Sequence, residues 1–262
     1  MKVVKYGGHV LNDSDTNKAI IRAIADLHQQ GEKIVVVHGG GPAINDELAI
    51  HGITSEMVGG YRKTSPEAME IVQQALAGSV LRSLTNSFIA CGVNAVGISA
   101  ADGKIIRAEK FQPTVNGETL DIGLVGEPTQ VDVSLLHLLL DAGYLPIVSP
   151  IGVDIHGQAL NINGDIAAGA IAGALQAEEV LFITDVAGIY RSWPDKTSII
   201  TEISKEELAG IATTFADGIA PKVKAVLSAL DSGAKKARII DGTDLEKLKS
   251  SLSGVGGTVV VA

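Results

Sequence analysis

The stretch Lys33-Ile34-Val35-Val36-Val37-His38-Gly39-Gly40-Gly41-Pro42 indicates the fold class of this chain. Its first half is rich in β-branched side chains, which is typical of a buried strand. Three glycines then make a tight turn, and Pro42 stands where helices commonly begin. The N-terminal end has the same order, with a strand over residues 3–6, Gly7-Gly8, and helical spacing over residues 13–30. Strands and helices that alternate in this way predict a parallel sheet between layers of helices.

The alternation continues to the end of the chain. We expect helices over residues 65–90 (divided near Gly78), 132–142, 164–175, 204–211 and 221–232, and strands over residues 94–98, 145–148, 180–184, 237–240 and 258–261. Short apolar runs among Gly, Pro and Asn in residues 105–125 predict hairpins. Pro146 places its strand at a sheet edge or at a strand start. No low-complexity linker separates the two halves, so we expect a lobe boundary near residues 170–178.

The composition excludes several classes of protein. Hydrophobic residues make up 46% of the 262 residues and charged residues 19%, which excludes a disordered chain. The net charge is −9 and the pI is near 5.1, which disfavours nucleic acid and anionic membranes as partners. The one cysteine, Cys91, cannot form a disulfide within the chain. The N-terminus lacks a signal peptide's apolar core, and no apolar run reaches the roughly 18 residues of a membrane span, so we expect a soluble, cytoplasmic protein.

Two glycine motifs follow predicted strands. Lys5 ends the first strand before Gly7-Gly8, and His38 ends the second strand before Gly39-Gly40-Gly41. Open α/β folds bind ligands at the carboxyl edge of the sheet, where glycines let backbone N–H groups approach an anion. Neither motif is a P-loop, because no Gly-Lys-Ser or Gly-Lys-Thr occurs in the chain. An ordinary tight turn is the alternative for each motif taken alone.

Four further motifs place polar residues at predicted turns. Arg62, in Gly59-Gly60-Tyr61-Arg62-Lys63-Thr64, suits bidentate capture of a carboxylate or is a solvated basic turn. Asp165, in Leu160-Asn161-Ile162-Asn163-Gly164-Asp165, either caps a helix or organises a metal or lysines around a phosphate. Residues 182–189 end a strand in Thr-Asp at the ligand edge. Lys222 stands at a helix start against the helix dipole, which makes it a functional candidate, with a solvated lysine as the alternative.

Taken together, in this order and spacing, the six motifs resemble those of the amino acid kinase family over essentially the whole chain. Gly-Gly-Tyr-Arg-Lys-Thr and Asn-Ile-Asn-Gly-Asp are most similar to the members that act on N-acetyl-L-glutamate, rather than on carbamate, uridylate, aspartate or glutamate. The resemblance implies a three-layer αβα sandwich around a central, mainly parallel sheet of about eight strands. It also implies an N-terminal lobe (residues 1–175) for N-acetyl-L-glutamate binding and dimerisation, and a C-terminal lobe (residues 176–262) for ATP with Mg²⁺.

The implied reaction transfers the γ-phosphoryl group of ATP to the side-chain carboxylate of N-acetyl-L-glutamate, the second step of arginine biosynthesis. By this resemblance Lys5 and Lys222 stabilise the transferring phosphoryl group, and Asp165 orients both lysines. The other implied residues are phosphate-binding Gly7, Gly8 and Gly39, substrate-binding Gly40, Gly41, Arg62 and Asn161, and nucleotide-binding Asp185, Val186, Gly188, Ile189, Tyr190, Thr214, Phe215 and Ala216. No residue is implied as a metal ligand, because the nucleotide phosphates hold the Mg²⁺ in the main.

Two features depart from the family pattern. His9 follows Gly8, where a small or apolar residue is more usual, and we expect a packed or hydrogen-bonded histidine there. Only four residues precede Lys5, which leaves no room for the interlacing N-terminal helix of the arginine-inhibited hexameric members. We therefore expect an arginine-insensitive homodimer.

Three other interpretations stay open at this point. One is another acyl-phosphate kinase, with a different acidic amino acid or a carrier-linked substrate. A second is a non-catalytic regulatory protein that binds nucleotide or acetylglutamate, although Lys5, Asp165 and Lys222 are all present. A Rossmann dehydrogenase is the weakest, because the chain lacks the Gly-x-Gly-x-x-Gly fingerprint after its first strand. The sequence does not decide whether a PII-type regulatory partner binds.

Overall fold

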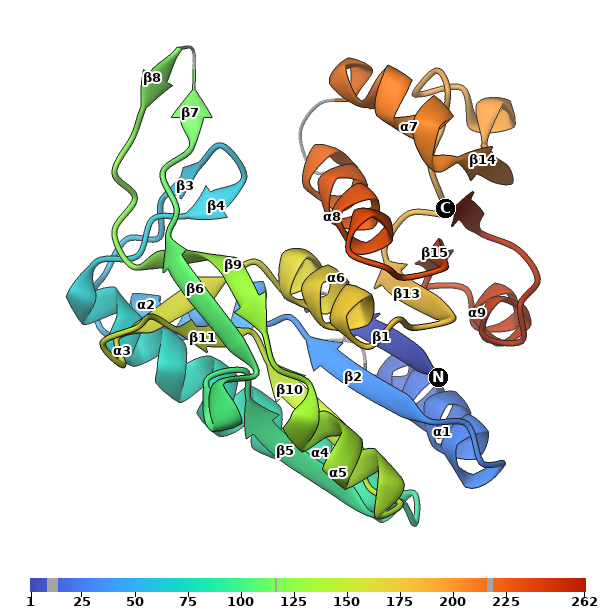
Figure 1. The fold of residues 1–262 in the computed structure, drawn as a ribbon, viewed down its shortest axis with the longest axis horizontal. Helices are drawn as coiled ribbons and strands as arrows, with labels where there is room; N and C mark the ends of the chain where they lie inside the picture. Colours follow the sequence, from blue (N-terminus) through green and yellow to red (C-terminus); the bar gives the residue numbers. More distant parts are fainter. Residues whose placement is uncertain (9–13, 116, 216–218) are drawn as a thin grey trace.

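The computed structural model describes residues 1–8, 14–115, 117–215 and 219–262 (Figure 1). Its centre is an eight-stranded sheet in the order β14-β16-β15-β13-β1-β2-β10-β5. All neighbouring pairs are parallel except β15 and β16. The predicted mainly parallel sheet is therefore confirmed. The strands span β1 Lys2–Tyr6, β2 Ile34–His38, β5 Ala95–Ser99, β10 Leu145–Ser149, β13 Glu179–Thr184, β14 Glu202–Ser204, β15 Lys236–Asp241 and β16 Thr258–Val261.

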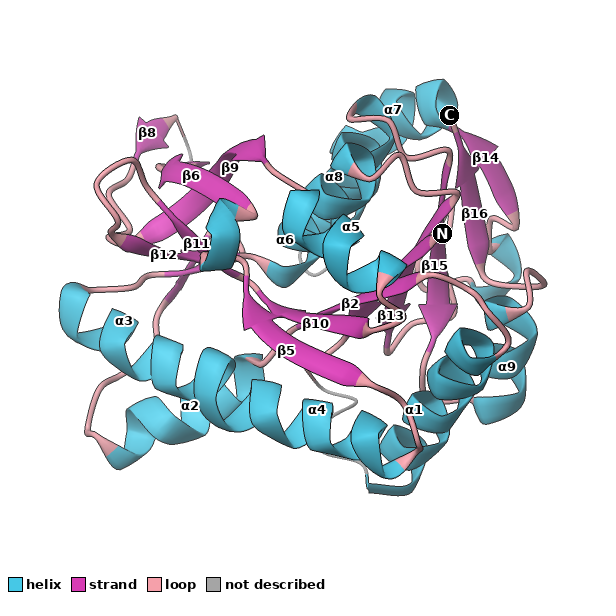
Figure 2. Ribbon diagram, turned by 60° about the horizontal axis from the view of Figure 1, so that its bottom comes forward, coloured by secondary structure: helices cyan, strands magenta, loops and turns pink. Residues whose placement is uncertain are grey.

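Helices cover both faces of this sheet, which confirms the three layers. Figure 2 shows α1, α4 and α9 on one face and α5, α6 and α8 on the other. The cores on the two faces consist mainly of aliphatic side chains. Alternate residues of each strand point to opposite faces, so the strands contribute to both cores. The helices span α1 Ser14–Gln29, α2 Gly41–Ile50, α3 Pro66–Gln73, α4 Leu81–Ala90, α5 Ser134–Asp141, α6 Gly164–Ala174, α7 Lys205–Ile211, α8 Ala220–Asp231 and α9 Leu245–Leu252, with short turns η3 Asp102–Lys104, η4 Lys196–Ser198 and η5 Ala212–Thr214.

The predicted division near Gly78 is not a break in the helix. A π-helical segment, η2 (Gln74–Val80), joins α3 to α4, and the residues that flank it, Gln73 and Leu81, keep right-handed helical dihedral angles. Gly78 lies inside this wide turn. Short π segments of this kind occur often near functional sites. Here the segment brings Leu76 against the glycine loop after β2.

A smaller antiparallel unit stands beside the carboxyl edge of the sheet. It is a closed barrel in the order β11-β12-β9-β6, formed by β6 Ile106–Lys110, β9 Val125–Val131, β11 Ile151–Val153 and β12 Ala159–Ile162. The hairpins predicted over residues 105–125 are confirmed in part by β6 and by the pair β7 Thr114–Val115 and β8 Glu118–Thr119. The sequence did not predict β11 and β12, because strands of three or four residues carry too little pattern.

A second small hairpin carries Arg62. Its strands are β3 (Met57–Val58) and β4 (Tyr61–Arg62), which pair antiparallel. Gly59 and Gly60 form the turn with φ of 57° and 83°. Two consecutive positive φ angles are the requirement of a type I′ turn, whose twist matches that of a hairpin. The glycines therefore build the hairpin that presents Arg62.

Pro146 lies in an interior strand, near its start. Strand β10 has neighbours on both sides, β2 and β5, and its pairing with β2 begins at Ile147, the residue after the proline. The missing N–H of Pro146 therefore costs no bond to β2. Of the two positions expected for this proline, the strand start is the one observed.

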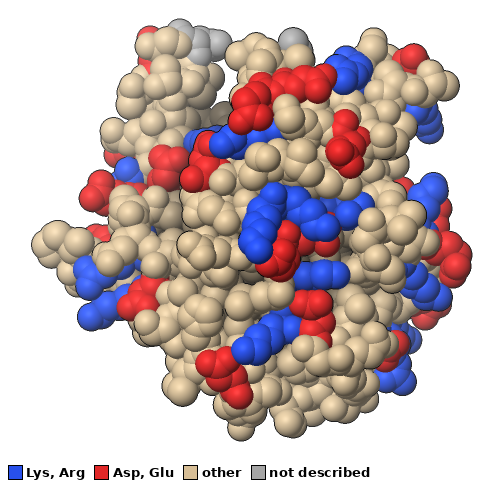
Figure 3. Space-filling view, turned by 45° about the vertical axis from the view of Figure 1, so that its right-hand side comes forward, with Lys and Arg blue, Asp and Glu red and all other residues tan. Residues whose placement is uncertain are grey.

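The surface carries charges of both signs. On the face shown in Figure 3, Lys and Arg alternate with Asp and Glu, and no broad area of one sign appears there. None of the helices in the described part of the chain is long and apolar enough to cross a membrane.

Candidate functional site

A cleft of about 1060 Å³ opens at the carboxyl edge of the sheet, between this edge, the barrel and α8. Strands β1 and β2 end there, and the glycine motifs that follow them form part of its wall. Among the predicted site residues, the lining contains Lys5, Gly8, Gly39, Gly40, Gly41, Arg62, Asn161, Asp165, Phe215 and Lys222. Residues from widely separated motifs thus meet in one place.

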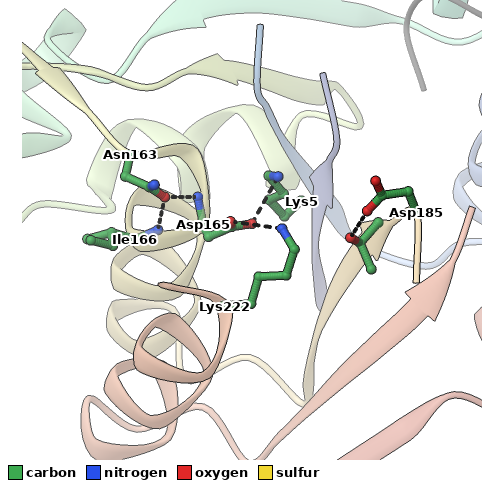
Figure 4. Close-up of polar contacts among 7 residues, drawn as sticks. Lys5, Asn163, Asp165, Ile166, Asp185 and Lys222 are labelled. Atoms are coloured by element: carbon green, nitrogen blue, oxygen red, sulfur yellow. Dashed lines mark hydrogen bonds and ion pairs between the residues drawn. The ribbon is translucent and has the colours of Figure 1, made fainter. Parts of the chain in front are cut away.

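Two lysines flank one carboxylate inside this cleft (Figure 4). Lys5 Nζ lies 2.9 Å from Asp165 Oδ1, and Lys222 Nζ lies 3.5 Å from Asp165 Oδ2. Lys5 comes from β1, Asp165 from the first turn of α6, and Lys222 from the first turn of α8. Lys5 and Asp165 are buried, with residue exposures of 8% and 7%. One carboxylate therefore fixes two ammonium groups close together.

The start of α6 sets the direction of Asp165. Asn163 caps this helix, and its Oδ1 accepts hydrogen bonds from the N–H groups of Asp165 at 2.8 Å and Ile166 at 3.3 Å. Asparagine is a favoured capping residue because its side chain satisfies these free amides. The sequence offered Asp165 as a cap, but Asn163 has that role. The Asp165 side chain therefore does not cap the helix and pairs with Lys5 and Lys222 instead.

Asp165 is ionised despite its burial. Burial by itself raises the pKa of this carboxyl, but the charges and hydrogen bonds of Lys5 and Lys222 outweigh it and hold the pKa below its ordinary value. The anion neutralises only part of the positive charge of two lysines. The cluster therefore keeps a net positive charge, which attracts an anionic ligand.

The two glycine loops pack directly against each other. A Cβ on Gly8 would lie 3.1 Å from the backbone nitrogens of both Gly40 and Gly41. A Cβ on Gly40 would lie 2.5 Å from Leu76 Cδ2. Close approach of this kind brings several backbone N–H groups to one wall, which suits phosphate oxygens. Gly7 is buried next to this wall and is not part of the lining.

Arg62 and Asn161 lie in the same cleft. The Arg62 guanidinium donates from Nη2 to Gly41 O at 3.4 Å and from Nη1 to Ser55 Oγ. Burial lowers the pKa of Arg62 from its ordinary value, although an arginine stays charged. Asn161, on β12, donates from Nδ2 to Thr64 Oγ1 at 3.2 Å. A cationic fork and an amide near the glycine loop can together hold a substrate that has both carboxylate and amide groups.

The predicted nucleotide segment after β13 lies outside the lining of this cleft. Thr184 Oγ1 donates to Asp185 Oδ1 at 3.0 Å, and Figure 4 shows no dashed contact between Asp185 and the lysine cluster. Ile189 is buried, and its N–H donates to Thr258 Oγ1 at 2.8 Å. The nucleotide roles given to Asp185, Val186, Gly188, Ile189, Tyr190, Thr214 and Phe215 stay predictions. Ala216 and His9 lie outside the described residues.

The sequence missed a polar and aromatic group on the far wall of the cleft. Tyr61 and Phe111 pack with ring centroids 4.5 Å apart, and Lys224 stands over both rings. All three line the cleft. Tyr61 belonged to a motif, but only Arg62 was singled out there. Lys224 follows Lys222 by two residues, a spacing that gives no sign of a shared site on a helix.

The described residues contain no group of three or more His, Cys, Asp or Glu side chains placed to hold a metal ion. Among the residues that the structure describes, the lining of the cleft carries four cationic side chains, Lys5, Arg62, Lys222 and Lys224, and one carboxylate, Asp165.

The chain is similar to known proteins over nearly its whole length. A model of the amino acid kinase family matches residues 1–241. The acetylglutamate kinase of Corynebacterium urealyticum is 44% identical over 97% of this chain and 84% of that protein. The acetylglutamate kinase of Paenarthrobacter aurescens is 42% identical over 92% of this chain and 79% of that protein.

Solved structures show the same fold. The N-acetylglutamate synthase of Neisseria gonorrhoeae, solved with coenzyme A and N-acetyl-glutamate, has a TM-score of 0.84 and 25% identity. The match covers 100% of this chain but 59% of the synthase, so the chain spans less than two thirds of that protein.

Proposed function

Because the chain belongs to the amino acid kinase family, we propose that it transfers the γ-phosphoryl group of ATP to the side-chain carboxylate of N-acetyl-L-glutamate. The products are ADP and N-acetyl-L-glutamyl 5-phosphate, in the second step of arginine biosynthesis. In this transfer a bond forms between a carboxylate oxygen and the γ-phosphorus. The bond between that phosphorus and the bridging oxygen of ADP breaks, and ADP leaves with the electron pair.

The observation that carries this proposal is the cluster of Lys5, Asp165 and Lys222 beside the two glycine loops. Transfer between two anions needs charge neutralisation and positioning more than covalent chemistry. An ammonium group about 4 Å from developing charge contributes up to about 4 kcal/mol at an effective dielectric constant of 20. Lys5 and Lys222 can each supply such a charge to the moving phosphoryl group, with Asp165 fixing their positions.

We assign the binding of N-acetyl-L-glutamate to the part of the cleft that is lined by Arg62, Asn161 and the glycine loop after β2. Arg62 and Asn161 hold the carboxylate and backbone groups of N-acetyl-L-glutamate, and Gly40 and Gly41 supply backbone contacts to the same molecule. The contact of Arg62 Nη2 with Gly41 O supports this grouping, because it puts the guanidinium at the glycine loop. The loop amides of Gly8 and Gly39 are assigned to the phosphate oxygens.

The nucleotide is assigned to the C-terminal lobe, residues 176–262, and N-acetyl-L-glutamate to the N-terminal lobe, residues 1–175. Asp185 to Tyr190 and Thr214 to Ala216 form the nucleotide pocket in this proposal. Phe215 lines the cleft and supports it. Mg²⁺ enters with the nucleotide and is held in the main by its phosphates, where it offsets their negative charge. The cationic lining suits such a metal-bearing ligand.

We also propose that the protein works as a cytoplasmic homodimer. The edge strand β5 pairs with β10 alone among the strands of the central sheet. Helices α4 and α5 and strand β10 lie near this edge strand (Figure 1). Exposed apolar side chains belong to these elements or adjoin them: Ile89 on α4, Leu138 on α5 and Tyr144 before β10. A second copy covers both the open edge and the apolar side chains. Light scattering tests this: a monomer mass at micromolar concentration contradicts the dimer.

An acceptor panel with hydroxylamine tests the proposed reaction. The protein is incubated with ATP, Mg²⁺ and hydroxylamine, together with N-acetyl-L-glutamate, L-glutamate, L-aspartate or no acceptor. Hydroxylamine converts an acyl phosphate to a hydroxamate, so hydroxamate from N-acetyl-L-glutamate alone supports the proposal. Hydroxamate from another acceptor identifies a different acyl-phosphate kinase. Binding of ATP or acetylglutamate without any hydroxamate supports a regulatory protein instead.

A further inference from the structure

Lys224 connects α8 to the opposite, far wall of the cleft. It lies in the proposed C-terminal lobe, but its contacts are with the proposed N-terminal lobe. Its Nζ lies 3.2 Å from Glu127 Oε1 on β9 and 3.3 Å from Tyr61 Oη on β4. The same Nζ stands 5.0 Å from the ring centroid of Phe111 and 5.9 Å from that of Tyr61.

These contacts together specify one position for the ammonium group. An exposed ion pair contributes little to stability by itself, and both partners here are about half exposed. The ammonium group of Lys224, however, also faces two packed aromatic rings and a phenol oxygen. A carboxylate, a hydroxyl group and two ring faces converge on one cation and so fix where it lies. The contact therefore acts on the position of Lys224 more than on the stability of the fold.

Each end of this contact adjoins a residue of the proposed active site. Tyr61 precedes Arg62 on the two-residue strand β4, so a shift of one moves the other. Lys224 and Lys222 belong to the first turns of α8, so they move as one rigid body. A contact between Tyr61 and Lys224 therefore couples the position of the guanidinium to the position of the second lysine.

We propose that Lys224 is a positioning residue that clasps the two lobes of the chain together. Its ammonium group binds Glu127 and the Tyr61–Phe111 pair, and holds the start of α8 at a fixed distance from the Arg62 hairpin. Lys222 and Arg62 then engage opposite ends of the reacting pair at the same time. This inference rests on the proposed function, because it assigns the clasp to the alignment of acetylglutamate with the nucleotide.

The clasp predicts coupling between the two substrates. Because the clasp ties the Arg62 hairpin to the start of α8, a substrate that orders the hairpin also orders Lys222, and the other substrate then binds to a site that is already in place. Such coupling is reciprocal in binding free energy. Loss of the clasp therefore weakens the mutual enhancement of binding by roughly 2- to 30-fold, while each substrate alone binds nearly as before.

The test is a double-mutant cycle with Lys224→Met, Glu127→Gln and the double variant. Titration calorimetry gives the affinity for N-acetyl-L-glutamate with and without a non-hydrolysable ATP analogue, and steady-state kinetics give kcat and KM. We expect each single variant to lose coupling and kcat, with the larger loss in Lys224→Met, and the double variant to lose no more than Lys224→Met alone. The charge exchange Lys224→Glu with Glu127→Lys should recover part of the loss, because it restores the ion pair but not the ring contact.

Lys249→Met is the matched control. Lys249 makes an ion pair with Glu246 at 3.3 Å on α9 and is not part of the cleft lining. The control should keep wild-type coupling and kcat. Unchanged coupling in Lys224→Met and Glu127→Gln, or losses that simply add in the double variant, would overturn the clasp. The wild-type protein distinguishes a failure of the clasp from a failure of the proposed function. If the wild type forms no hydroxamate from N-acetyl-L-glutamate, the proposed function itself is wrong.

Discussion

The Lys5 ammonium group lies 2.9 Å from Oδ1 of Asp165, and both residues are almost fully buried. They come from the first strand and from a helix far along the chain, and the fold brings them to one end of the sheet. The pair gives the cleft a cation that cannot move away into solvent. A fixed charge of this kind stabilises a transition state without reorganising when the reaction occurs.

Lys5→Ala should lower kcat far more than it weakens substrate binding. The lysine acts on charge that develops during transfer, so we expect kcat to fall on the order of 100- to 1000-fold with little change in the KM for acetylglutamate. Lys2→Ala is a suitable control, because Lys2 lies at the other end of β1 and donates to Leu252 O. A Lys5→Ala enzyme with the kcat of the wild type would remove Lys5 from the reaction.

Arg62→Ala should weaken the binding of N-acetyl-L-glutamate more than it lowers kcat. Loss of a charge-assisted contact to a substrate carboxylate raises the KM for N-acetyl-L-glutamate on the order of 10- to 100-fold, with a smaller effect on kcat. The neighbouring Lys63 pairs with Glu56 at 2.9 Å outside the cleft lining, so Lys63→Ala serves as the control. An unchanged KM in Arg62→Ala contradicts the assignment of this residue to the substrate.

Gly40→Ala should damage the glycine loop through Leu76. The new Cβ would lie 2.5 Å from Leu76 Cδ2, and Leu76 is buried in the core, so the loop or the Leu76 side chain has to shift. We expect kcat/KM to fall roughly 10- to 100-fold, because a displacement near 1 Å is enough for such a loss. Leu76→Ala makes room for the new Cβ. Adding Gly40→Ala to Leu76→Ala should therefore lower kcat/KM less than Gly40→Ala lowers it in the wild type. An equal loss in both backgrounds would mean that the steric account is wrong.

His38 should make the protein less stable as the pH falls. Burial lowers the pKa of His38 from 6.5 to about 4, and the hydrogen bond from Nδ1–H to Gly39 O opposes this only in part. The unfolded chain binds a proton first, so stability is complete above pH 6.5 and is lost between about pH 6.5 and 4. The loss amounts to about 3 kcal/mol. Urea unfolding of wild type and His38→Asn at several pH values measures it, and parallel pH curves for the two proteins would contradict the prediction.

The sequence predicted the sheet and the lysine cluster well. Strands such as residues 33–37 are uniformly β-branched and end in glycine, and a lysine at a strand end or a helix start stands out against local preference. These signals are local, so a single sequence contains them. The spatial meeting of Lys5, Asp165 and Lys222 came from the family resemblance rather than from spacing.

The far wall of the cleft could not be predicted in the same way. Phe111, Glu127 and Lys224 are far apart along the chain and meet because a small barrel stands opposite α8. Two of the barrel strands are only three and four residues long, and tertiary pairing rather than sequence pattern defines them. The sequence left a helix cap open as one role of the Asn163-Gly164-Asp165 motif, and because both Asn and Asp are good caps, only the geometry assigns the cap to Asn163.

The transfer of isotope from substrate to phosphate tests the central claim most directly. N-acetyl-L-glutamate labelled with ¹⁸O in its side-chain carboxylate is incubated with the protein, ATP, Mg²⁺ and hydroxylamine, and the released phosphate is analysed by mass spectrometry. Hydroxylamine attacks the acyl carbon, so the oxygen that bonded to phosphorus leaves with the phosphate. The account predicts one ¹⁸O in each phosphate, and none when the label is in the α-carboxylate. Unlabelled phosphate from the side-chain-labelled substrate would contradict attack by that carboxylate.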